Sequence, residues 1–514
     1  MASKILKGDM PELMENILNN LNDDIYSLHS CTLVSRHWCK MSIPILWQEP
    51  FLFETRPSFI SNYFSSLDEY DKFFLLRCGI NEEFSETLFD YARFLKVLNL
   101  WKFKCKVDDW IELFNSKSLN DDNTSSYHII NLLFKLLIES GAILHKFSLC
   151  FSKSLEFKPE IFYTLGQNVQ FFSQIQHLSL VLVDLNIESA ITWLRALVNN
   201  VTKIRTLKFI EENYSRHVHH VNDMLPLIHS FIYIIKSQEQ LRKFSLFGVR
   251  YITKFHGIIS VLESQKNSLQ EVRIDNCNFS AEFEVLNNCK NLETLRIMYC
   301  NPILSKLSNI LDYKISTLQL NDYPIDARSI ALILKKSGIL LQRLCLKSDH
   351  EINEEPLLLE AIKSFCPNIT CLRISGFVIS TQFIELIGNF QKLQFLSLRC
   401  NTDGIPDEEL KIRIIQFSEI LPLTLQYFCL GHWLRKYVDI LLNHCNASLK
   451  KLSIYEIYNE KILKALVEFC KRIKTLNYVS VSRYLDLDDN IKKELETYVA
   501  LVPYKPTDDG FKFL

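Results

Sequence analysis

The histidines are the first residues whose type and spacing suggest chemistry. His217, His219 and His220 crowd into one short run, and neutral imidazoles are common metal ligands. No cysteine or carboxylate accompanies them at the spacing that metal sites use. We therefore interpret the run as a solvated loop and expect no metal site.

Motifs for catalysis are missing from the sequence. It has no G-x-S-x-G, H-E-x-x-H, GxGxxG or GxxxxGK[ST] pattern, and only 12 glycines. The 15 cysteines include no C-x-x-C pair, so we interpret them as buried thiols rather than as a zinc or redox site. We expect no catalytic residue, no cofactor and no enzymatic activity.

The charge balance excludes other classes of partner. Lys and Arg number 58 and Asp and Glu number 59, so nothing in the composition favours binding to nucleic acid or to an anionic membrane. The N-terminus has no apolar run typical of a signal peptide, and no stretch of 18 apolar residues occurs. We expect a cytoplasmic or nuclear protein, or one in both places.

A six-residue pattern recurs along the chain. Its form is Φ-x-x-Φ-x-Φ, where Φ is apolar, and successive copies begin 23 to 49 residues apart. Such self-similarity is typical of leucine-rich repeats, in which each copy adds a short strand and the intervening residues add a helix. The apolar side chains of one copy are buried only by its neighbours, so the array must be continuous. The copies begin at Leu95, Leu144, Ile175, Ile204, Leu241, Leu269, Leu292, Ile315, Leu341, Ile369, Leu393, Leu425, Leu449 and Ile473.

These repeats predict an α/β fold. We expect a leucine-rich-repeat solenoid with a curved parallel sheet inside and helices outside, preceded by three short helices. Cys277 and Cys300 stand eight positions after the first apolar residue of their copies, which resembles the cysteine-containing repeat class. A polar loop is expected over 116–126 and a last helix over 491–501.

Three short helices are predicted in the first 48 residues. Leu13, Ile17, Leu18 and Leu21 recur at helical spacing, and two further apolar stripes follow within residues 25–41. Helices of this length hold too little core to be stable alone. The segment either caps the next domain or completes its core on a partner protein.

These residues resemble the F-box. The segment has MPEL at 10–13, IL at 17–18, DD at 23–24, VSRHW at 34–38 and PILW at 44–47, in the order and spacing of that family's pattern. Counted back from Ile17, Pro11 stands one place later than the family's proline, and Met10 takes the proline's place. A proline one place later still suits the start of a helix.

The resemblance implies docking to the Skp adaptor of a cullin–RING ubiquitin ligase, by helices packed against a groove on the adaptor. The chain would then be the substrate-recognition subunit of an SCF-type ligase. The sequence does not separate side chains that face the adaptor from those that form the core of the motif. The candidates are Pro11, Leu13, Ile17, Leu21, Leu28, Val34, Trp38, Leu46 and Trp47.

Arginines gather on the predicted inner surface of the repeats. A guanidinium suits two-point contact with a carboxylate or phosphate, so we expect these arginines to receive an acidic or phosphorylated segment of a protein target. Alternatively they are solvated and pair with local acids such as Glu271 or Asp275. The residues are Arg273, Arg296, Arg343, Arg373 and Arg399.

The domain organisation follows from these patterns. We predict an F-box at 1–48, a helical linker and N-terminal cap at 49–94, a repeat solenoid at 95–480, and a C-terminal cap and tail at 481–514. The alternative function is a repeat scaffold for protein interactions that has no part in a ligase.

Overall fold

The computed structural model divides the chain into two compact units, Met1–Ser268 and Leu269–Leu514. The boundary falls inside the predicted repeat array, after its fifth copy. Met10 and the histidine run at 217–220 lie outside the described residues. The structure describes residues 11–22, 24–52, 55–114, 122–184, 186–198, 200–212, 221–248, 257–277, 281–300, 314–321, 325–348, 350–431, 433–457, 459–484 and 489–503.

Parallel strands in chain order form the sheet of the first unit. Each strand coincides with one predicted copy of the six-residue pattern, and each pairs with the next along the chain. The strands are β1 (Val97–Asn99), β2 (Lys146–Ser152), β3 (His177–Asp184), β4 (Thr206–Glu211) and β5 (Lys243–Phe247).

The second unit continues the same arrangement. Its strands are also parallel and follow chain order. They are β6 (Glu271–Asp275), β7 (Thr294–Met298), β8 (Thr317–Asn321), β9 (Arg343–Lys347), β10 (Cys371–Val378), β11 (Phe395–Asn401), β12 (Tyr427–Cys429), β13 (Lys451–Ile457), β14 (Tyr478–Tyr484) and β15 (Ala500–Pro503).

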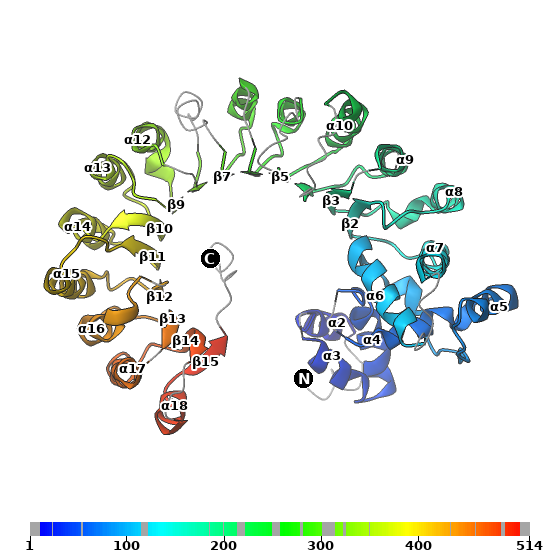
Figure 1. Ribbon diagram of the computed structural model, residues 1–514, viewed down its shortest axis with the longest axis horizontal. Coiled ribbons are helices and arrows are strands. Elements are labelled where there is room, and N and C mark those ends of the chain that lie inside the picture. Colours follow the sequence, from blue (N-terminus) through cyan, green and yellow to red (C-terminus); the bar gives the residue numbers. More distant parts are fainter. Residues whose placement is uncertain are drawn as a thin grey trace. The chain divides into compact units, whose positions relative to one another are not determined.

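Helices connect the strands and lie together on one face of the sheet in each unit (Figure 1). In the first unit they are α6 (Leu100–Glu112), α7 (Asp122–Glu139), α8 (Pro159–Gln167), α9 (Ile187–Val198), α10 (Val221–Lys236) and the 3-10 helices η3 (Val169–Phe171) and η4 (Ser260–Gln265). In the second they are α12 (Ala327–Ser337), α13 (Glu355–Phe365), α14 (Thr381–Asn389), α15 (Asp407–Ile420), α16 (Val438–His444), α17 (Glu460–Arg472), α18 (Asp489–Glu496) and the 3-10 helices η5 (Ala281–Asn288), η6 (Gly338–Leu340) and η7 (Arg435–Tyr437). This alternation confirms the predicted α/β repeat fold.

One hydrogen-bond pattern sets the register of the strands. In most copies, the carbonyl of the second residue accepts the backbone N–H groups of the second and third residues of the next copy, and we call this the shared-carbonyl pattern. Lys96 O, for example, accepts from His145 N at 2.8 Å and from Lys146 N at 3.1 Å. Thr370 O likewise accepts from Gln394 N at 2.8 Å and from Phe395 N at 3.0 Å.

The predicted apolar positions form the core between strands and helices. In the copy that begins at Leu144, the side chains of Leu144, Phe147 and Leu149 are at most 1% exposed. The corresponding residues of neighbouring copies lie directly opposite in the parallel register, as Phe147 does to Leu178. Each strand therefore buries its apolar face against the next repeat, as the sequence pattern requires.

Two cysteines occupy equivalent places after β6 and β7. Asn276 and Tyr299 precede them with φ of 53° and 54°, which turns the chain at the strand end. Cys277 and Cys300 are then 5% and 1% exposed, and the Sγ of Cys300 lies 3.1 Å from the carbonyl oxygen of Met298. These thiols are packing elements of two adjacent repeats.

Three predicted boundaries are wrong. The last helix ends at Glu496 rather than at 501, because residues 500–503 pair in parallel with β14 as β15. The polar stretch predicted as a loop over 116–126 enters α7 at Asp122, since a cluster of short polar residues also suits a helix start. The fourteenth copy begins at Leu476 rather than at Ile473, because Asn477 and Tyr478 donate to the carbonyl of Lys450 and β14 pairs with β13 from Tyr478 onward.

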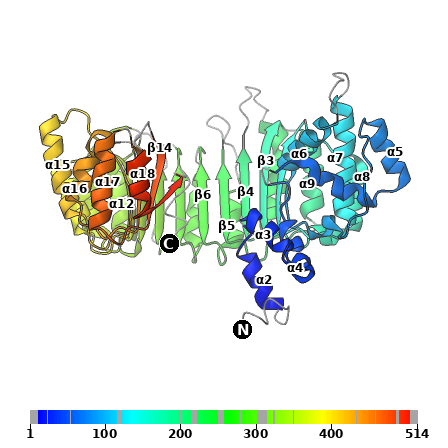
Figure 2. The same ribbon diagram turned by 90° about the horizontal axis from the view of Figure 1, so that it is seen from below.

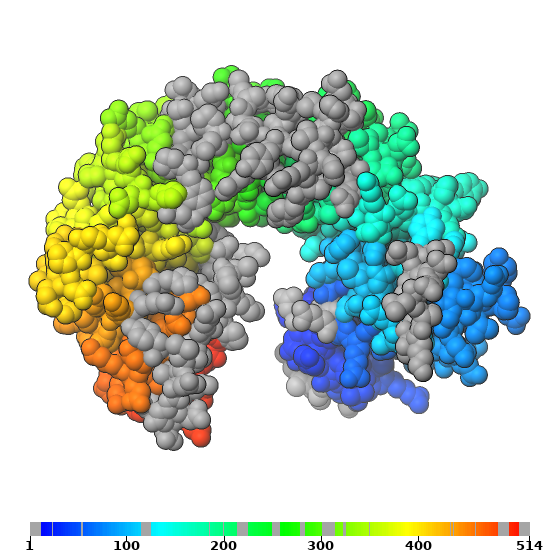
Figure 3. Space-filling view, in the orientation of Figure 1, coloured from blue at the N-terminus to red at the C-terminus, as the bar shows by residue number. Residues whose placement is uncertain are grey.

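Three helices precede the repeats in the first unit: α2 (Pro11–Asn19), α3 (Ile25–Thr32) and α4 (Arg36–Leu46). Both ribbon views show them grouped together (Figures 1 and 2), and they form a compact lobe in the space-filling view (Figure 3). Asp24 starts α3 by accepting the N–H of Ser27 at 3.0 Å, and Ser35 starts α4 by accepting the N–H of Trp38 at 3.2 Å.

The segment between this lobe and β1 is helical in part. It contains α5 (Glu69–Arg77) and the 3-10 helices η1 (Pro57–Ser66) and η2 (Tyr91–Phe94). Ile60 and Phe64 of η1 are fully buried, and Phe64 packs against Trp110 of α6 with ring centroids 5.2 Å apart. The segment therefore covers the first repeat with aromatic side chains.

Candidate docking surfaces

The three-helix lobe has a small apolar core of its own. Met14 and Leu18 of α2 are fully buried, and they pack with Leu28 of α3 and Ile45 of α4. The predicted candidates that contribute to this core are Leu28, which is 1% exposed, and Leu21, Trp38 and Leu46, which are partly buried against it.

A second apolar stripe of the lobe remains exposed. Leu13 and Ile17 lie one turn apart on α2, beside the buried stripe of Met14 and Leu18, and they are 37% and 43% exposed. Val34, in the turn between α3 and α4, is 59% exposed. Large side chains in these places gain little from the fold of the chain itself, so each is available to a partner.

Two further exposed apolar side chains of the lobe were not among the sequence candidates. Tyr26 and Leu33 are 89% and 77% exposed, at the start of α3 and just after its end. The sequence feature that could have identified them is an apolar side chain at the end of a helix. At such a position the helical period does not predict whether the side chain is buried or exposed. We call Leu13, Ile17, Tyr26, Leu33 and Val34 the apolar patch.

Trp47 lies at the junction between the lobe and the repeats. It is 9% exposed, and its ring stacks on Tyr91 of η2 with centroids 4.0 Å apart and meets Tyr63 of η1 edge-on at 5.4 Å. The next residue, Gln48, accepts the backbone N–H groups of Lys96 and Val97, both at 3.0 Å. The carbonyl of Gln48 is thus equivalent to the carbonyl of the second residue in a copy. These two hydrogen bonds connect the end of the lobe to the first strand of the array. The side chain of Pro11 lies outside the described set.

The five candidate arginines all lie on strands of the second unit. Arg273, Arg296 and Arg373 share one row of the register on β6, β7 and β10, whereas Arg343 and Arg399 lie in the two flanking rows. At a strand spacing of about 4.8 Å, Arg373 is about 14 Å from Arg296 across the sheet. The structure brings Arg273 and Arg296 side by side and spreads the other three.

Local acids contact two of these arginines. Arg296 Nε lies 3.0 Å from Glu271 Oε1, and its Nη1 donates to Gln319 Oε1 at 3.0 Å. Arg273 Nη2 lies 3.3 Å from Asp275 Oδ2. Burial raises the pKa of Asp275, and the nearby Arg273 partly offsets that rise. Glu271 and Asp275, the acids named in the alternative interpretation, therefore compete with a target for these two arginines.

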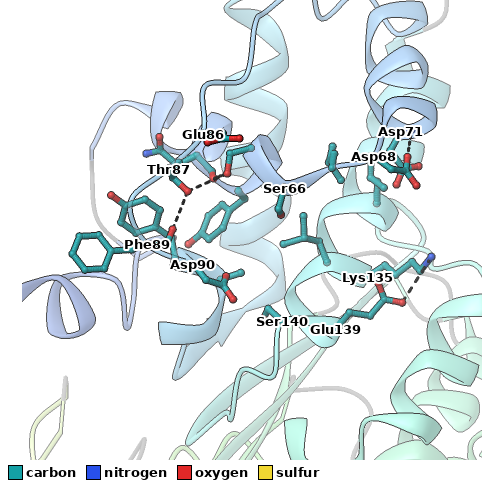
Figure 4. A pocket seen from close by; sticks show the side chains of 18 of the residues that line it. Ser66, Asp68, Asp71, Glu86, Thr87, Phe89, Asp90, Lys135, Glu139 and Ser140 are labelled. Carbon is teal, nitrogen blue, oxygen red and sulfur yellow. Dashed lines mark hydrogen bonds and ion pairs between the residues drawn. The ribbon is translucent and has the colours of Figure 1, made fainter. Parts of the chain in front are cut away.

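A polar cavity of about 780 Å³ lies in the first unit between η1, the start of α5, residues 86–92 and α7 (Figure 4). Most ionisable groups on its wall are carboxylates, and the pKa of Asp71 is raised by burial and then by its neighbour Asp68. On the same wall, Lys135 Nζ lies 3.8 Å from Glu139 Oε1. The cavity thus favours a cation electrostatically, but acids alone do not define a site. The acids on its wall are Asp68, Asp71, Glu86, Asp90 and Glu139.

Within the described ranges, no group of three or more His, Cys, Asp or Glu residues is arranged to hold a metal ion. No helix in that part of the chain is long and apolar enough to cross a membrane.

Comparisons with known proteins give weak similarities. No protein-family model matches the sequence, and no curated protein is significantly similar to it. Among solved structures, the complex of Rad7 and Elc1 from yeast contains a chain with a TM-score of 0.35 and 14% identity, over 78% of this chain and 85% of that one. A leucine-rich-repeat protein of Leptospira interrogans has a TM-score of 0.27 and 14% identity, over 72% and 91%. The repeat fold is established by the strands and helices described above.

Proposed function

We propose that this protein is the substrate-recognition subunit of an SCF-type E3 ubiquitin ligase. The lobe of α2, α3 and α4 docks the Skp adaptor, and the strand face of the repeats holds a protein target. The observation that carries the proposal is the apolar patch, a set of exposed apolar side chains on a lobe with only a small core of its own. The F-box pattern of the same residues gives that patch its expected partner.

The chemistry of the patch suits an adaptor groove. Leu13, Ile17 and Val34 bring aliphatic side chains from two elements to one lobe, and Tyr26 adds a large ring. Apolar helical side chains that enter a groove contribute most of the affinity in this mode of recognition. Trp47 acts in this proposal as a positioning residue, because it holds the lobe against the array.

The protein takes no catalytic step in this proposal. It holds the target close to the other ligase subunits and so raises the effective concentration of the target's lysines. On the repeat side, we propose that Arg273, Arg296, Arg343, Arg373 and Arg399 contact acidic or phosphorylated groups of the target.

Adaptor capture tests the proposal. The variant of this chain carrying Leu13→Asp, Ile17→Asp and Val34→Asp should lose adaptor binding by at least about 100-fold, since each of the three apolar anchors contributes about 1 kcal/mol or more. Purified Skp adaptor is titrated against the protein, and binding is measured by calorimetry. Circular dichroism checks that the variants fold, as expected for changes at exposed positions.

A matched control carries Leu332→Asp and Ile339→Asp, two similarly exposed apolar residues on α12 and η6, which are 52% and 65% exposed. It should bind the adaptor like the unaltered protein. If the unaltered protein does not bind the adaptor, or if the patch variant binds as well as the control, the ligase role is wrong and a repeat scaffold becomes the better description.

A further inference from the structure

The strand face of the first unit carries a concentration of positive charge at one end of its strands. The residues in the second and third positions of consecutive copies include Lys96, His145, Lys146, His177, Arg205 and Arg242. Five of these side chains are exposed, and that of Lys96 is half-buried. We call these six residues the basic strip.

The register explains why these charges form one surface. Lys146 on β2 lies opposite His177 on β3, which in turn lies opposite Thr206 on β4, next to Arg205. The second-position backbone groups are hydrogen-bonded in series by the shared-carbonyl pattern, from Gln48 through Lys96, His145, Gln176 and Arg205 to Arg242. The strip therefore crosses adjacent strands without interruption.

The electrostatics of the two histidines show how close these charges are. The pKa of His177 is lowered by burial and by four cations, Lys146, Lys208, Lys243 and Arg205. The pKa of His145 is lowered by burial and by Lys96. No acidic residue occupies the second, third or fifth position of any copy from β1 to β5. An anion on the strip would relieve this repulsion between like charges.

The spread of the charges indicates the shape of the ligand. From β1 to β5 the strip is about 19 Å long at the usual strand spacing. An extended peptide of about six residues has the same length. The lysines and arginines of the strip come singly from four copies, as Lys96, Lys146, Arg205 and Arg242, whereas a single phosphate is held best by converging arginine forks.

We propose that the basic strip binds an extended segment rich in aspartate and glutamate, belonging to a protein that the repeats capture. The inference deepens the proposed function and rests on it only for the source of that segment. Nucleic acid is disfavoured as the ligand, because it is a long polyanion and the chain has no overall excess of positive charge beyond the strip, with 58 Lys and Arg against 59 Asp and Glu.

A peptide-binding experiment on the full chain tests the strip. A fluorescently labelled octaglutamate peptide is titrated and its anisotropy is recorded at low and physiological salt. Binding should weaken as salt rises, and octaglutamine should not bind. The variant carrying Lys146→Glu, Arg205→Glu and Arg242→Glu should bind octaglutamate at least about tenfold more weakly.

Two further variants test whether the loss of octaglutamate binding is specific to the strip. Arg195→Glu with Lys236→Glu changes exposed charges on α9 and α10, helices of the same unit, and should leave octaglutamate binding unchanged apart from a small general effect. Arg343→Glu with Arg373→Glu alters the candidate arginines of the second unit. Equal losses in the strip variant and the helix variant would overturn the proposal, as would a preference for a phosphoserine peptide or single-stranded RNA over octaglutamate.

The outcomes separate this inference from the proposed function. One result would be that octaglutamate binding is lost in the variant of the second-unit arginines and kept in the strip variant. That result would show that the arginines bind the anionic segment, and it would refute only the proposal for the strip. Failure to bind the adaptor, with peptide binding intact, would refute the ligase role and leave the strip in place.

Discussion

Glu355 is a carboxylic acid in an apolar setting at the start of α13. The residue is 8% exposed, and its Oε2 accepts the backbone N–H of Val378 at 2.9 Å. Burial raises its pKa to about 7, with a small addition from Glu351, while the bond from Val378 acts in the opposite direction. This carboxyl therefore titrates near neutral pH in the folded protein.

The raised pKa predicts a pH-dependent stability. Between about pH 4.5 and about pH 7 the folded state binds the proton that the unfolded state releases, so the free energy of unfolding falls as pH rises through this window. Glu355→Gln, which keeps an oxygen to accept from Val378, should remove this loss and be more stable than the unaltered protein at pH 8, by up to about 3 kcal/mol.

Urea unfolding at about pH 5 and about pH 8 measures the effect. Glu360→Gln, an exposed change on the same helix, is the control. If Glu355→Gln and Glu360→Gln show the same difference between the two pH values, the Glu355 carboxyl is not the titrating group.

Trp47 shows what the sequence can and cannot decide about a single residue. Its place in the F-box pattern was predictable, but an aromatic residue at the end of a helix suits either an interface or a core. The rings that bury it, Tyr63 and Tyr91, come from a segment with weak periodicity. Only the fold brings them together, so the orientation of Trp47 could not be predicted.

At the scale of elements, buried glutamines join successive repeats of the first unit. Gln238 accepts the N–H of Ile204 at 2.9 Å and donates to the carbonyls of Val201 and Ile234 at 2.9 and 2.7 Å. Gln265, in the next repeat, accepts the N–H of Leu241 at 3.2 Å and donates to the carbonyl of Gln238 at 3.0 Å. Each side chain satisfies backbone groups at the end of a helix and before a strand.

Replacing one of these glutamines should destabilise the first unit. Gln238→Leu leaves the buried N–H of Ile204 and the carbonyl of Val201 without these partners, at a cost of about 2–4 kcal/mol. The exposed change Gln391→Leu should cost less than about 0.5 kcal/mol. Thermal unfolding followed by circular dichroism gives both values, and equal melting temperatures would show that the glutamine bonds do not support the repeats.

The repeat pattern was predictable, and these glutamines were not. Apolar triplets recur often enough for their period to define a strand in each copy, and the structure places β1 to β13 on the first thirteen predicted copies. The fourteenth copy was predicted at Ile473, but β14 begins at Tyr478, so this copy starts three residues later, at Leu476. A buried glutamine is one polar residue in a variable segment, and nothing nearby in the sequence distinguishes Gln265 from an exposed residue. The strand β15 was also missed, because Ala500–Pro503 lacks the spacing of the other copies.

At the scale of the molecule, the join between lobe and array is a structural unit in its own right. Trp47 packs against η1 and η2, and Gln48 holds the first strand. Trp47→Ala should therefore destabilise the first unit by about 3–5 kcal/mol, although the change lies outside the repeats.

Hydrogen exchange measures this effect locally. The amides of Lys96 and Val97 should exchange faster in Trp47→Ala, whereas amides of the second unit should keep their rates. Trp101→Ala, at a tryptophan that is 43% exposed, is the matched control and should change these amides little. Equal exchange at Lys96 and Val97 in both variants would mean that the lobe and the array fold independently.

The shared-carbonyl pattern also determines where the sequence of such a protein can gain residues during evolution. The 49 residues from Leu95 to Leu144 and the 23 from Leu269 to Leu292 end in nearly the same contacts, with N–O distances of 2.8 and 3.1 Å in one case and 2.9 and 3.0 Å in the other. The length of the segment that connects two strands therefore does not affect the hydrogen bonds between those strands. Insertions there can accumulate during evolution without shifting any residue that faces the ligand.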